Sequence, residues 1–453
     1  MTRILGQYIS LATATLGLVE LVLSFLIVET LLHMATGPSG FATAAPPPVT
    51  GLAEFAAVFA LVTGGIATSI GLYRPEVCLE PRQRIASAAV AGIVAYPVLL
   101  LLMVIDRSQT GLTGWVVLWL GIALLVWQAG ILLTHLAFRV LLRRERMVRR
   151  VIVVGSGHHA ARFADMLRTP RVRLFEPMIA PTTTSLSPES LRERGIWGVV
   201  VTSPDDTETH APALLDSKLR GARVLSTAAF CERHLGRIDL DGVDAQWLLR
   251  ADGFAHGQLA DLVKRGLDIA VSLTLLVMAL PVMLIAALAI KLESPGAVLY
   301  RQQRVGLYGT PFTLLKFRSM RVDAEASGNP RWAQRRDPRV TRVGRFIRPL
   351  RIDELPQLIN VLLGEMSMIG PRPERPHFVR HLADVIPLYR QRSYVKPGVT
   401  GWAQVNYPYG ASVEDAREKL AYDLYYIKNR SLLLDLLILF ATVRVVLYRE
   451  GAR

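Results

Sequence analysis

LDIAVSLTLLVMALPVMLIAALAI, residues 267–290, is an almost wholly apolar stretch with Asp268 near its start and Pro281 past its middle. Its length would allow one membrane crossing, which takes roughly 20 apolar residues. However, proline removes a backbone donor and breaks a helix. Basic residues also flank both ends, and they favour the cytoplasmic side of a membrane. We therefore predict a re-entrant helix–break–helix over 267–290, with a plain spanning helix as the alternative.

Several further apolar runs lie upstream, before residue 140. Each is long enough to cross the hydrocarbon core, and arginines cluster after the last run, which places both ends of the set in the cytoplasm. We predict a four-helix transmembrane domain over residues 1–147, with the arginines against anionic membrane lipids. The runs cover about Leu11–His33, Gly51–Tyr73, Ile85–Ile105 and Leu112–Phe138.

The composition of the whole chain agrees with a membrane protein. Of the 453 residues, 51% are hydrophobic and only 20% are charged, and the mean hydropathy is +0.33. These values exclude an ordinary cytosolic enzyme and a disordered scaffold as readings of the whole chain. The formal net charge of +15 favours anionic partners. Cys78 and Cys231 are too few for a disulfide framework or a cysteine-based zinc site.

Glu20 is the one carboxylate deep inside the first apolar run. A carboxylate within a membrane is a functional-site hypothesis by default, provided that a partner can be named. The sequence places no obvious basic residue to pair with it. We therefore favour a packing role in the helix bundle for Glu20.

The middle third has the pattern of an α/β domain. The apolar run Val151–Val154 precedes GSGHHA at 155–160, which has the form G-x-G-x-x-A between a predicted strand and a predicted helix. Glu176 follows at the distance of a ribose-binding acid. The motif is short and common, so we favour a structural or regulatory role over nucleotide binding. We predict a Rossmann-like α/β domain over residues 148–250.

The last third carries a second motif, DELPQLINVL at residues 353–362. Its leucines and isoleucine recur at helical spacing, and Pro356 is at home only in a first helical turn. Asp353 and Glu354 are therefore expected at a helix N-terminus. Neighbouring carboxylates on one helix point about 100° apart, which suits one that attacks phosphorus and one that holds a metal. The alternative is a capping acid with solvated arginine partners.

Ordered blocks over residues 262–453 resemble the bacterial sugar transferase family of polyprenyl-phosphate sugar-1-phosphate transferases. The resemblance implies a membrane protein of the α plus α/β class, whose mainly α catalytic domain occupies residues 251–453. The order of the three domains resembles the long members that start exopolysaccharide assembly. The matching blocks include KRGLD (264–268), QRVG (303–306), KFRSM (316–320), DELPQ (353–357), GEMSMIGPRP (364–373) and KPGVTGWAQVN (396–406).

The resemblance also implies a reaction. Asp353 would attack the β-phosphorus of a UDP-sugar, with glucose favoured, and would expel UMP. The sugar 1-phosphate would then pass to undecaprenyl phosphate, while Glu354 would hold Mg²⁺. The resemblance places the protein in the bacterial inner (cytoplasmic) membrane, with its catalytic domain on the cytoplasmic face. It suggests a homodimer and gives no role to nucleic acid. The expected substrate-binding residues are Lys316, Arg318, Arg348, Arg351, Arg372, Arg392 and Gln404.

Two other classes of function are compatible with parts of the sequence. One is a nucleotide-sensing membrane scaffold or regulator of polysaccharide assembly without transferase activity, and the dense polar blocks of the last third count against it. The other is a transporter of lipid-linked sugars. Four membrane crossings with few charged residues inside them give that role little support.

Overall fold

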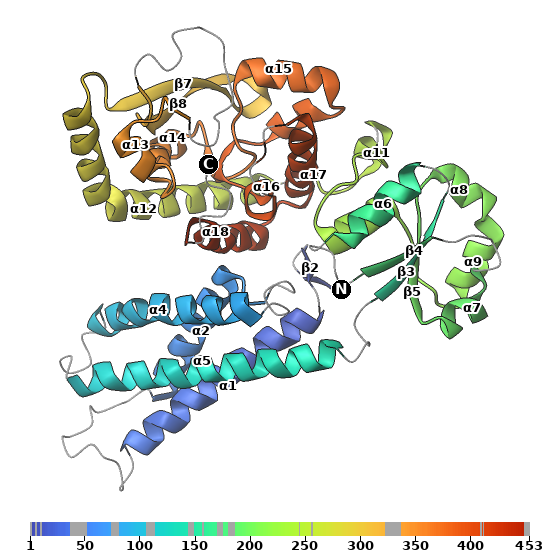
Figure 1. Ribbon diagram of the computed structural model, residues 1–453, viewed down its shortest axis with the longest axis horizontal. Helices are drawn as coiled ribbons and strands as arrows, with labels where there is room; N and C mark the ends of the chain where they lie inside the picture. The colour runs from blue at the N-terminus through green and yellow to red at the C-terminus, as the bar shows by residue number, and fades with distance from the viewer. Residues whose placement is uncertain are drawn as a thin grey trace. The chain divides into compact units, whose positions relative to one another are not determined.

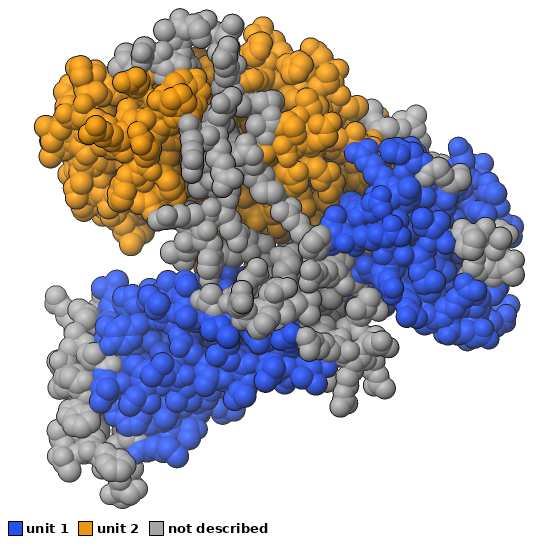
Figure 2. Space-filling model, in the orientation of Figure 1, with its two compact units in different colours: residues 1–4, 8–226 blue, residues 5–7, 227–453 orange. Residues whose placement is uncertain are grey.

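The computed structural model divides the chain into two compact units, Met1–Ile4 with Tyr8–Ser226 and Leu5–Gln7 with Thr227–Arg453 (Figure 2). Each unit is described by itself. The residues that the structure describes are 2–4, 7–9, 11–36, 52–73, 81–105, 114–143, 149–155, 158–169, 175–179, 186–243, 245–254, 257–321, 337–407, 410 and 412–447.

Apolar helices make up the first part of unit 1. Two short strands, β1 (Thr2–Ile4) and β2 (Gln7–Ile9), precede them. Neighbouring helices along the chain pack against each other, and the first also packs against the last (Figure 1). Among the described residues of this part, Thr15–Met34 and Leu118–Val140 are long and apolar enough to cross a membrane. The helices are α1 (Leu11–Thr36), α2 (Leu52–Ile70), α4 (Pro81–Ile105) and α5 (Gly114–Arg143).

Glu20 has a partner here that the sequence did not reveal. His135 of α5 is fully buried, and its Nε2 lies 3.2 Å from Oε1 of Glu20. The hydroxyl of Thr134 donates a hydrogen bond of 2.5 Å to the same oxygen. The contact joins α1 to α5, so the spacing of residues within one helix gave no sign of it. The pair helps to fix how these two helices pack, and a packing role for Glu20 stays our prediction.

The second part of unit 1 is an α/β domain with a four-stranded parallel sheet in the order β4-β3-β5-β6. Valines 151, 153, 199 and 200 are fully buried, as expected for a parallel sheet covered on both faces. The strands are β3 (Arg149–Val154), β4 (Phe175–Ile179), β5 (Ile196–Val201) and β6 (Val224–Ser226). The helices are α6 (His158–Arg168), α7 (Pro188–Glu193), α8 (Pro204–Thr209) and α9 (Ala211–Leu219).

Unit 2 is mainly helical, with an antiparallel pair β7–β8 and a short parallel pair β9–β10. Its elements are α10 (Thr227–Phe230), the π-helical turn η3 (Cys231–Leu235), α11 (Ala245–Arg250), α12 (Gln258–Glu293), β7 (Leu299–Val305), η4 (Leu307–Gly309), β8 (Pro311–Phe317), α13 (Arg342–Ile347), η5 (Ile352–Glu354), α14 (Gln357–Leu363), β9 (Ser367–Ile369), α15 (Pro376–Val385), η6 (Tyr389–Tyr394), β10 (Gly398–Thr400), α16 (Trp402–Asn406), α17 (Val413–Asn429) and α18 (Leu432–Leu447).

The core of unit 2 includes Leu358 and Val361 of α14, Met366, and Tyr426 of α17. Ile238 belongs to the same core, so this compact unit begins well before residue 251. The predicted domain boundary at residue 250 stays a prediction.

Helix α12 runs without interruption through Pro281, and Figure 1 shows it bent into two arms. We had expected Pro281 to break the helix into two. Instead, proline bends a helix that continues through it. In the first arm, Arg265 donates to the carbonyl oxygens of Val361 and Leu362 at 2.6 and 2.8 Å. In the second arm, Ile290 packs with Phe317 and neighbouring residues. Both arms thus contact the same compact unit.

Candidate active site

The two adjacent carboxylates lie in η5, a 3-10 turn that leads into α14. Arg351 just before them has φ of 56°, in the left-handed region, and the amide of Glu354 donates to the Arg351 carbonyl at 3.1 Å. The α-helix itself starts only after Pro356, which has no N–H to donate. The carboxylates therefore lie on the 3-10 turn that precedes the α-helix, whereas the sequence pattern predicted them at the N-terminus of the helix itself.

Glu354 lies at the centre of a cluster of cations. Its Oε1 accepts from Lys316 Nζ at 3.2 Å and from Arg372 Nη2 at 2.6 Å. Its Oε2 accepts from Arg351 Nη1 at 3.2 Å. Lys316 comes from β8, and Arg372 from the loop after β9. Three elements thus bring three cations to one buried carboxylate, so these three side chains together with Glu354 and Asp353 carry a net positive charge.

Asp353 is buried beside this cluster. Among the residues that the structure describes, no donor forms a hydrogen bond with its carboxylate. Burial, and then the charge of Glu354, raise the pKa of Asp353 to about 6, while Lys316, Arg348 and Arg372 oppose the rise. The carboxyl group is therefore mostly ionised at neutral pH, and no donor from the described part of the chain occupies its oxygens.

The two neighbouring carboxyls have opposite pKa shifts. Burial alone would raise the pKa of Glu354, but Arg372, Lys316 and Arg351 together hold it well below its usual range. Burial lowers the pKa of Lys316, and the charge of Arg372 adds to this, against the attraction of the two carboxylates. Pairs of titratable groups whose surroundings push their pKa values apart are common in catalytic sites.

Arg372 owes its position to glycines packed at van der Waals contact. A Cβ atom on Gly370 would lie 2.3 Å from the carbonyl oxygen of Lys396, and one on Gly401 would lie 2.1 Å from that of Gly370. Only glycine allows the loops after β9 and β10 to approach this closely. The Arg372 guanidinium then bridges Glu354 and Gln404, whose Oε1 accepts from Nη1 at 3.2 Å.

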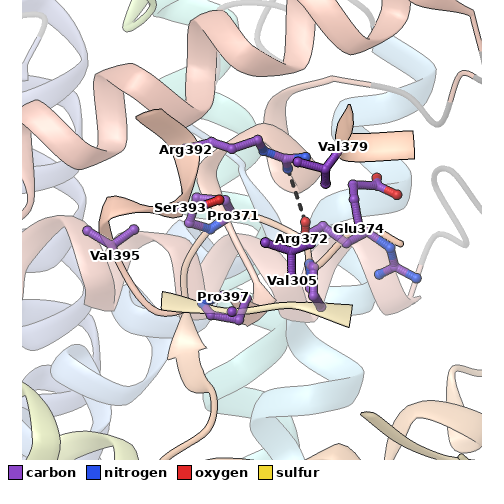
Figure 3. Close-up of a pocket in the computed structure, with 11 residues that line it drawn as sticks. Val305, Pro371, Arg372, Glu374, Val379, Arg392, Ser393, Val395 and Pro397 are labelled. Carbon is purple, nitrogen blue, oxygen red and sulfur yellow. Dashed lines mark hydrogen bonds between the residues drawn. The ribbon is translucent and has the colours of Figure 1, made fainter. Parts of the chain in front are cut away.

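A pocket opens beside Arg372 (Figure 3). Its polar lining includes Glu374 from the same loop and Arg392 and Ser393 from η6. Arg392 is held from both sides, because it donates to the Arg372 carbonyl at 3.0 Å and to Asp423 at 2.9 Å. The remaining lining comes from Val305, Gly306, Pro371, Pro373, Val379, Val395 and Pro397.

The structure brings most of the expected site residues together. Arg348 acts on Asp353 through its charge. Arg318 lies elsewhere: its guanidinium donates to the carbonyls of Pro295 and Ser294 at 2.8 Å each. These carbonyls follow the end of α12, where a basic side chain is a common cap. A substrate role for Arg318 thus has no geometric support, and the roles of the other residues stay predictions.

Two residues that hold parts of the site in place were not predicted from the sequence. Asp423 of α17 is buried and holds Arg392, with burial raising the pKa of Asp423 to about 6 against the pull of Arg392. Asn360 of α14 accepts from the amide of Leu315 at 3.0 Å and so ties α14 to β8. The sequence signal for Asp423 was a single acid within the otherwise uncharged and mostly apolar run AYDLYYI, at 421–427.

The glycine motif at 155–160 of the α/β domain, for which a structural or regulatory role is favoured, has different surroundings. Gly155 has φ of +155°, and a Cβ there would lie 1.9 Å from Thr202 Oγ1 and 2.8 Å from Asp206 Oδ2. Residues 156–157, with the second motif glycine, lie outside the described residues. Glu176 pairs in register with Arg150, at the opposite end of β3 from Gly155. It therefore lies away from the position of a ribose-binding acid.

Comparison with known proteins gives a match over unit 2. The family model described as "Bacterial sugar transferase" matches residues 259–449. A UDP-N-acetylgalactosamine-undecaprenyl-phosphate N-acetylgalactosaminephosphotransferase of Aeromonas hydrophila is 51% identical over 42% of this chain and 45% of its own length. An undecaprenyl-phosphate glucose phosphotransferase of Komagataeibacter xylinus is 35% identical over 68% of this chain and 61% of its own length.

A shorter relative is covered more fully. A UDP-glucose:undecaprenyl-phosphate glucose-1-phosphate transferase of Caulobacter vibrioides is 44% identical over 48% of this chain and 81% of its own length. The chain thus spans about half of the Aeromonas relative and most of the Caulobacter one. The matches of the Aeromonas and Caulobacter proteins are about the size of unit 2, whereas the Komagataeibacter match is longer.

Proposed function

This chain belongs to the bacterial sugar transferase family, and we propose that it transfers a hexose 1-phosphate from a UDP-sugar to undecaprenyl phosphate, releasing UMP. The three relatives described above are named for transfer of this kind. Their names support the reaction class for this chain. The product would be the first lipid-linked sugar of an exopolysaccharide.

The observation that carries the proposal is the ionised carboxylate of Asp353, which is buried beside a cluster of cations and has no hydrogen-bond donor among the described residues. In the first step, a carboxylate oxygen of Asp353 bonds to the β-phosphorus of the donor, and the bond from that phosphorus to the UMP oxygen breaks. In the second step, a phosphate oxygen of undecaprenyl phosphate attacks the same phosphorus. The Asp353–phosphorus bond then breaks and restores the carboxylate.

The cations around Glu354 suit the charge of the donor. A UDP-sugar brings a diphosphate to the site, and a site of net positive charge raises the local concentration of such an anion. Arg372 and Arg351 present planar guanidinium groups that match phosphate oxygens, and Lys316 adds a point charge beside them. The charge of Arg348 acts on Asp353, and Arg348 would stabilise charge on the transferred phosphoryl group.

We further propose that Glu354 holds Mg²⁺ when the donor is bound. Magnesium commonly binds one or two carboxylates together with substrate phosphates, and no larger group of metal-ligating side chains occurs among the described residues. Both oxygens of Glu354 accept from cations in this structure. One of these side chains would therefore turn to the phosphates as the ion binds. The ion would supply charge neutralisation at the diphosphate.

The placement of the protein in the membrane is also a proposal. The contacts of both α12 arms with one compact unit support a re-entrant helix, because a straight helix of this length would extend about 54 Å. We place the catalytic unit at the cytoplasmic face of the bacterial inner membrane. The helices α1, α2, α4 and α5 would form the four-helix membrane bundle, and the parallel sheet the Rossmann-like domain.

The donor sugar is proposed to be glucose, as in the names of the Komagataeibacter and Caulobacter relatives. The Aeromonas relative is named for N-acetylgalactosamine, so a panel of UDP-sugars is the appropriate test. Purified full-length protein with undecaprenyl phosphate should release UMP from one or two members of the panel. Release from none would contradict the proposed function.

The covalent step needs a separate test. With donor labelled in the β-phosphate and no acceptor, the protein should retain a labelled adduct. The variant Asp353→Asn should lose both the adduct and UMP release. Asp384→Asn, which removes an exposed acid on α15, is the matched control and should keep both. Full transfer by Asp353→Asn would refute the nucleophile.

A further inference from the structure

One edge of the parallel sheet in the α/β domain gathers arginines around a tryptophan. All strands of this sheet are parallel, so their amino ends lie at the same edge. Arg149 and Arg150 open β3, Trp197 is the second residue of β5, and Arg223 directly precedes β6. We call these four residues the amino edge.

Two guanidinium groups of the amino edge lie over one indole. The Cζ atoms of Arg149 and Arg223 are 5.0 and 4.9 Å from the centroid of the Trp197 ring. Phe175 of β4 packs edge-on against the same ring, with centroids 5.5 Å apart. The indole and its neighbour thus hold both cations in place before any ligand arrives.

The charges of these two arginines are not balanced by an ion pair with any described residue. Within the described part of the chain, neither Arg149 nor Arg223 forms an ion pair with a carboxylate. The nearby Glu176 is paired with Arg150, at 3.3 Å. Burial, and then the charge of Arg223, lower the pKa of Arg149. Two like charges held close together favour an anion that can bind both.

The opposite edge of the sheet has the reverse charge. Helix α8 begins just beyond the carboxyl end of β5, with Asp205 and Asp206 in its first turn. The domain is therefore basic where its strands begin and acidic where they end. An anionic surface would orient it with the amino edge inward.

The chain also keeps the amino edge near the end of α5. Helix α5 ends at Arg143 and β3 begins at Arg149. This connection can reach at most about 20 Å even when fully extended. Under the membrane placement proposed above, α5 leaves the bilayer on the cytoplasmic side at this point. The amino edge is then the part of the sheet that the chain holds closest to the lipid headgroups.

We propose that the amino edge binds the anionic lipid surface of the membrane and docks the α/β domain on it. Guanidinium groups bind phosphate oxygens through paired hydrogen bonds, and tryptophan is enriched at the level of the headgroups. Phosphate diesters of anionic phospholipids are the ligand class that meets both requirements. The inference rests on the proposed membrane placement of α5 and does not depend on the transferase reaction.

The test uses full-length protein in vesicles, with a fluorophore on one introduced cysteine in a Cys78→Ser background. Glu193→Cys places the label beside the amino edge, and Asp205→Cys places it at the carboxyl edge; both replace exposed acids. The quencher is a phosphatidylcholine with a nitroxide headgroup. In vesicles with 30% phosphatidylglycerol, we expect at least twofold stronger quenching at 193 than at 205.

The charge dependence separates docking from mere proximity. Arg149→Gln combined with Arg223→Gln should bring quenching at 193 down to the value at 205, as should vesicles of phosphatidylcholine alone. The control double variant Arg162→Gln with Lys218→Gln removes the same charge from helix surfaces and should leave the difference intact. UMP release and limited proteolysis report folding of every variant independently.

Three results would overturn the proposal. The first is equal quenching at 193 and 205 in anionic vesicles, and the second is a difference that survives in Arg149→Gln/Arg223→Gln. The third is loss of the difference when inorganic phosphate replaces part of the buffer salt at constant ionic strength, which would assign the edge to a soluble anion. Loss of UMP release with the quenching difference intact would count against the proposed function alone.

Discussion

The turns at Gly155 and at Asp353–Glu354 are the two places where the sequence has a motif compatible with phosphate binding, although a structural or regulatory role was favoured at Gly155, and their surroundings differ. At Glu354, Lys316 and Arg372 arrive from distant elements and supply positive charge. At Gly155, the side chain of Asp206 arrives instead and brings a negative charge. A short motif therefore specifies a backbone shape, whereas the chemistry depends on which side chains the rest of the fold brings to that turn.

The sharpest test of this difference removes one acid from each turn. Asp353→Asn should lower UMP release by at least about 10³-fold, because loss of a nucleophile removes the covalent route. Asp206→Asn should leave the rate within about twofold, since we assign the α/β turn no part in transfer. Initial rates of UMP release measure both. A large loss in Asp206→Asn would make the two turns functionally equivalent.

A smaller effect is expected from the cations at Glu354. Arg372→Gln breaks the shortest of the three contacts and leaves a buried carboxylate partly unpaired. Removing one donor that stabilises charge in the transition state costs roughly 10²–10³-fold in rate, and we expect a loss of that size in kcat/KM. Arg380→Gln, an exposed arginine of α15, is the control and should behave as the unaltered protein. A loss of less than threefold in kcat/KM for Arg372→Gln would contradict a catalytic role for the cations at Glu354.

The next largest effect is the fall in transfer rate on the acidic side of the pH profile. The ionised form of Asp353 is the nucleophile, and its pKa is raised to about 6. The rate should therefore fall below pH 6 and be about tenfold lower at pH 5 than on the neutral plateau. Glu354 stays ionised there, because its pKa is held well below the usual range. The limb should thus have a slope of one in a plot of log kcat/KM against pH.

A rate that stays flat down to pH 5 would show that Asp353 has an ordinary carboxyl pKa in the working enzyme. A slope of two would show that both carboxyls titrate together. Vesicle integrity and donor stability should be checked at each pH, so that the limb reports the enzyme alone.

The smallest effect on transfer is expected from the other turn. Gly155→Ala introduces a Cβ that would lie 1.9 Å from Thr202 Oγ1, in a backbone conformation with φ of +155°. We expect faster limited proteolysis within residues 149–226, because a side chain is strained in such a conformation. Transfer should remain within about twofold. A tenfold loss of transfer would show that the α/β domain takes part in catalysis.

Patterns within one element were predictable from the sequence. The apolar helices, the alternating α/β segment and the helix after Pro356 all have a period or a punctuation that local residues set. The carboxylates at 353 and 354 were found because an acid pair before a proline and an amphipathic run is unusual.

Contacts between distant segments were not predictable in the same way. His135 pairs with Glu20 across two helices, and Arg318 donates to the carbonyls at the end of α12. No spacing rule links these positions, because their proximity results from the packing of the whole unit. An arginine in a family motif can equally serve the fold or the ligand, and only geometry separates the two.

The bend of α12 has a mechanical consequence if the re-entrant placement holds. A crossing helix responds to the full thickness of the bilayer, by tilting or by stretching the lipids around it. A bent helix with both arms held on one protein core would occupy area in a single leaflet, like a wedge. Its energy would depend on lateral pressure and curvature of that leaflet, and hardly on bilayer thickness. Such a protein would accumulate where the inner leaflet is loosely packed.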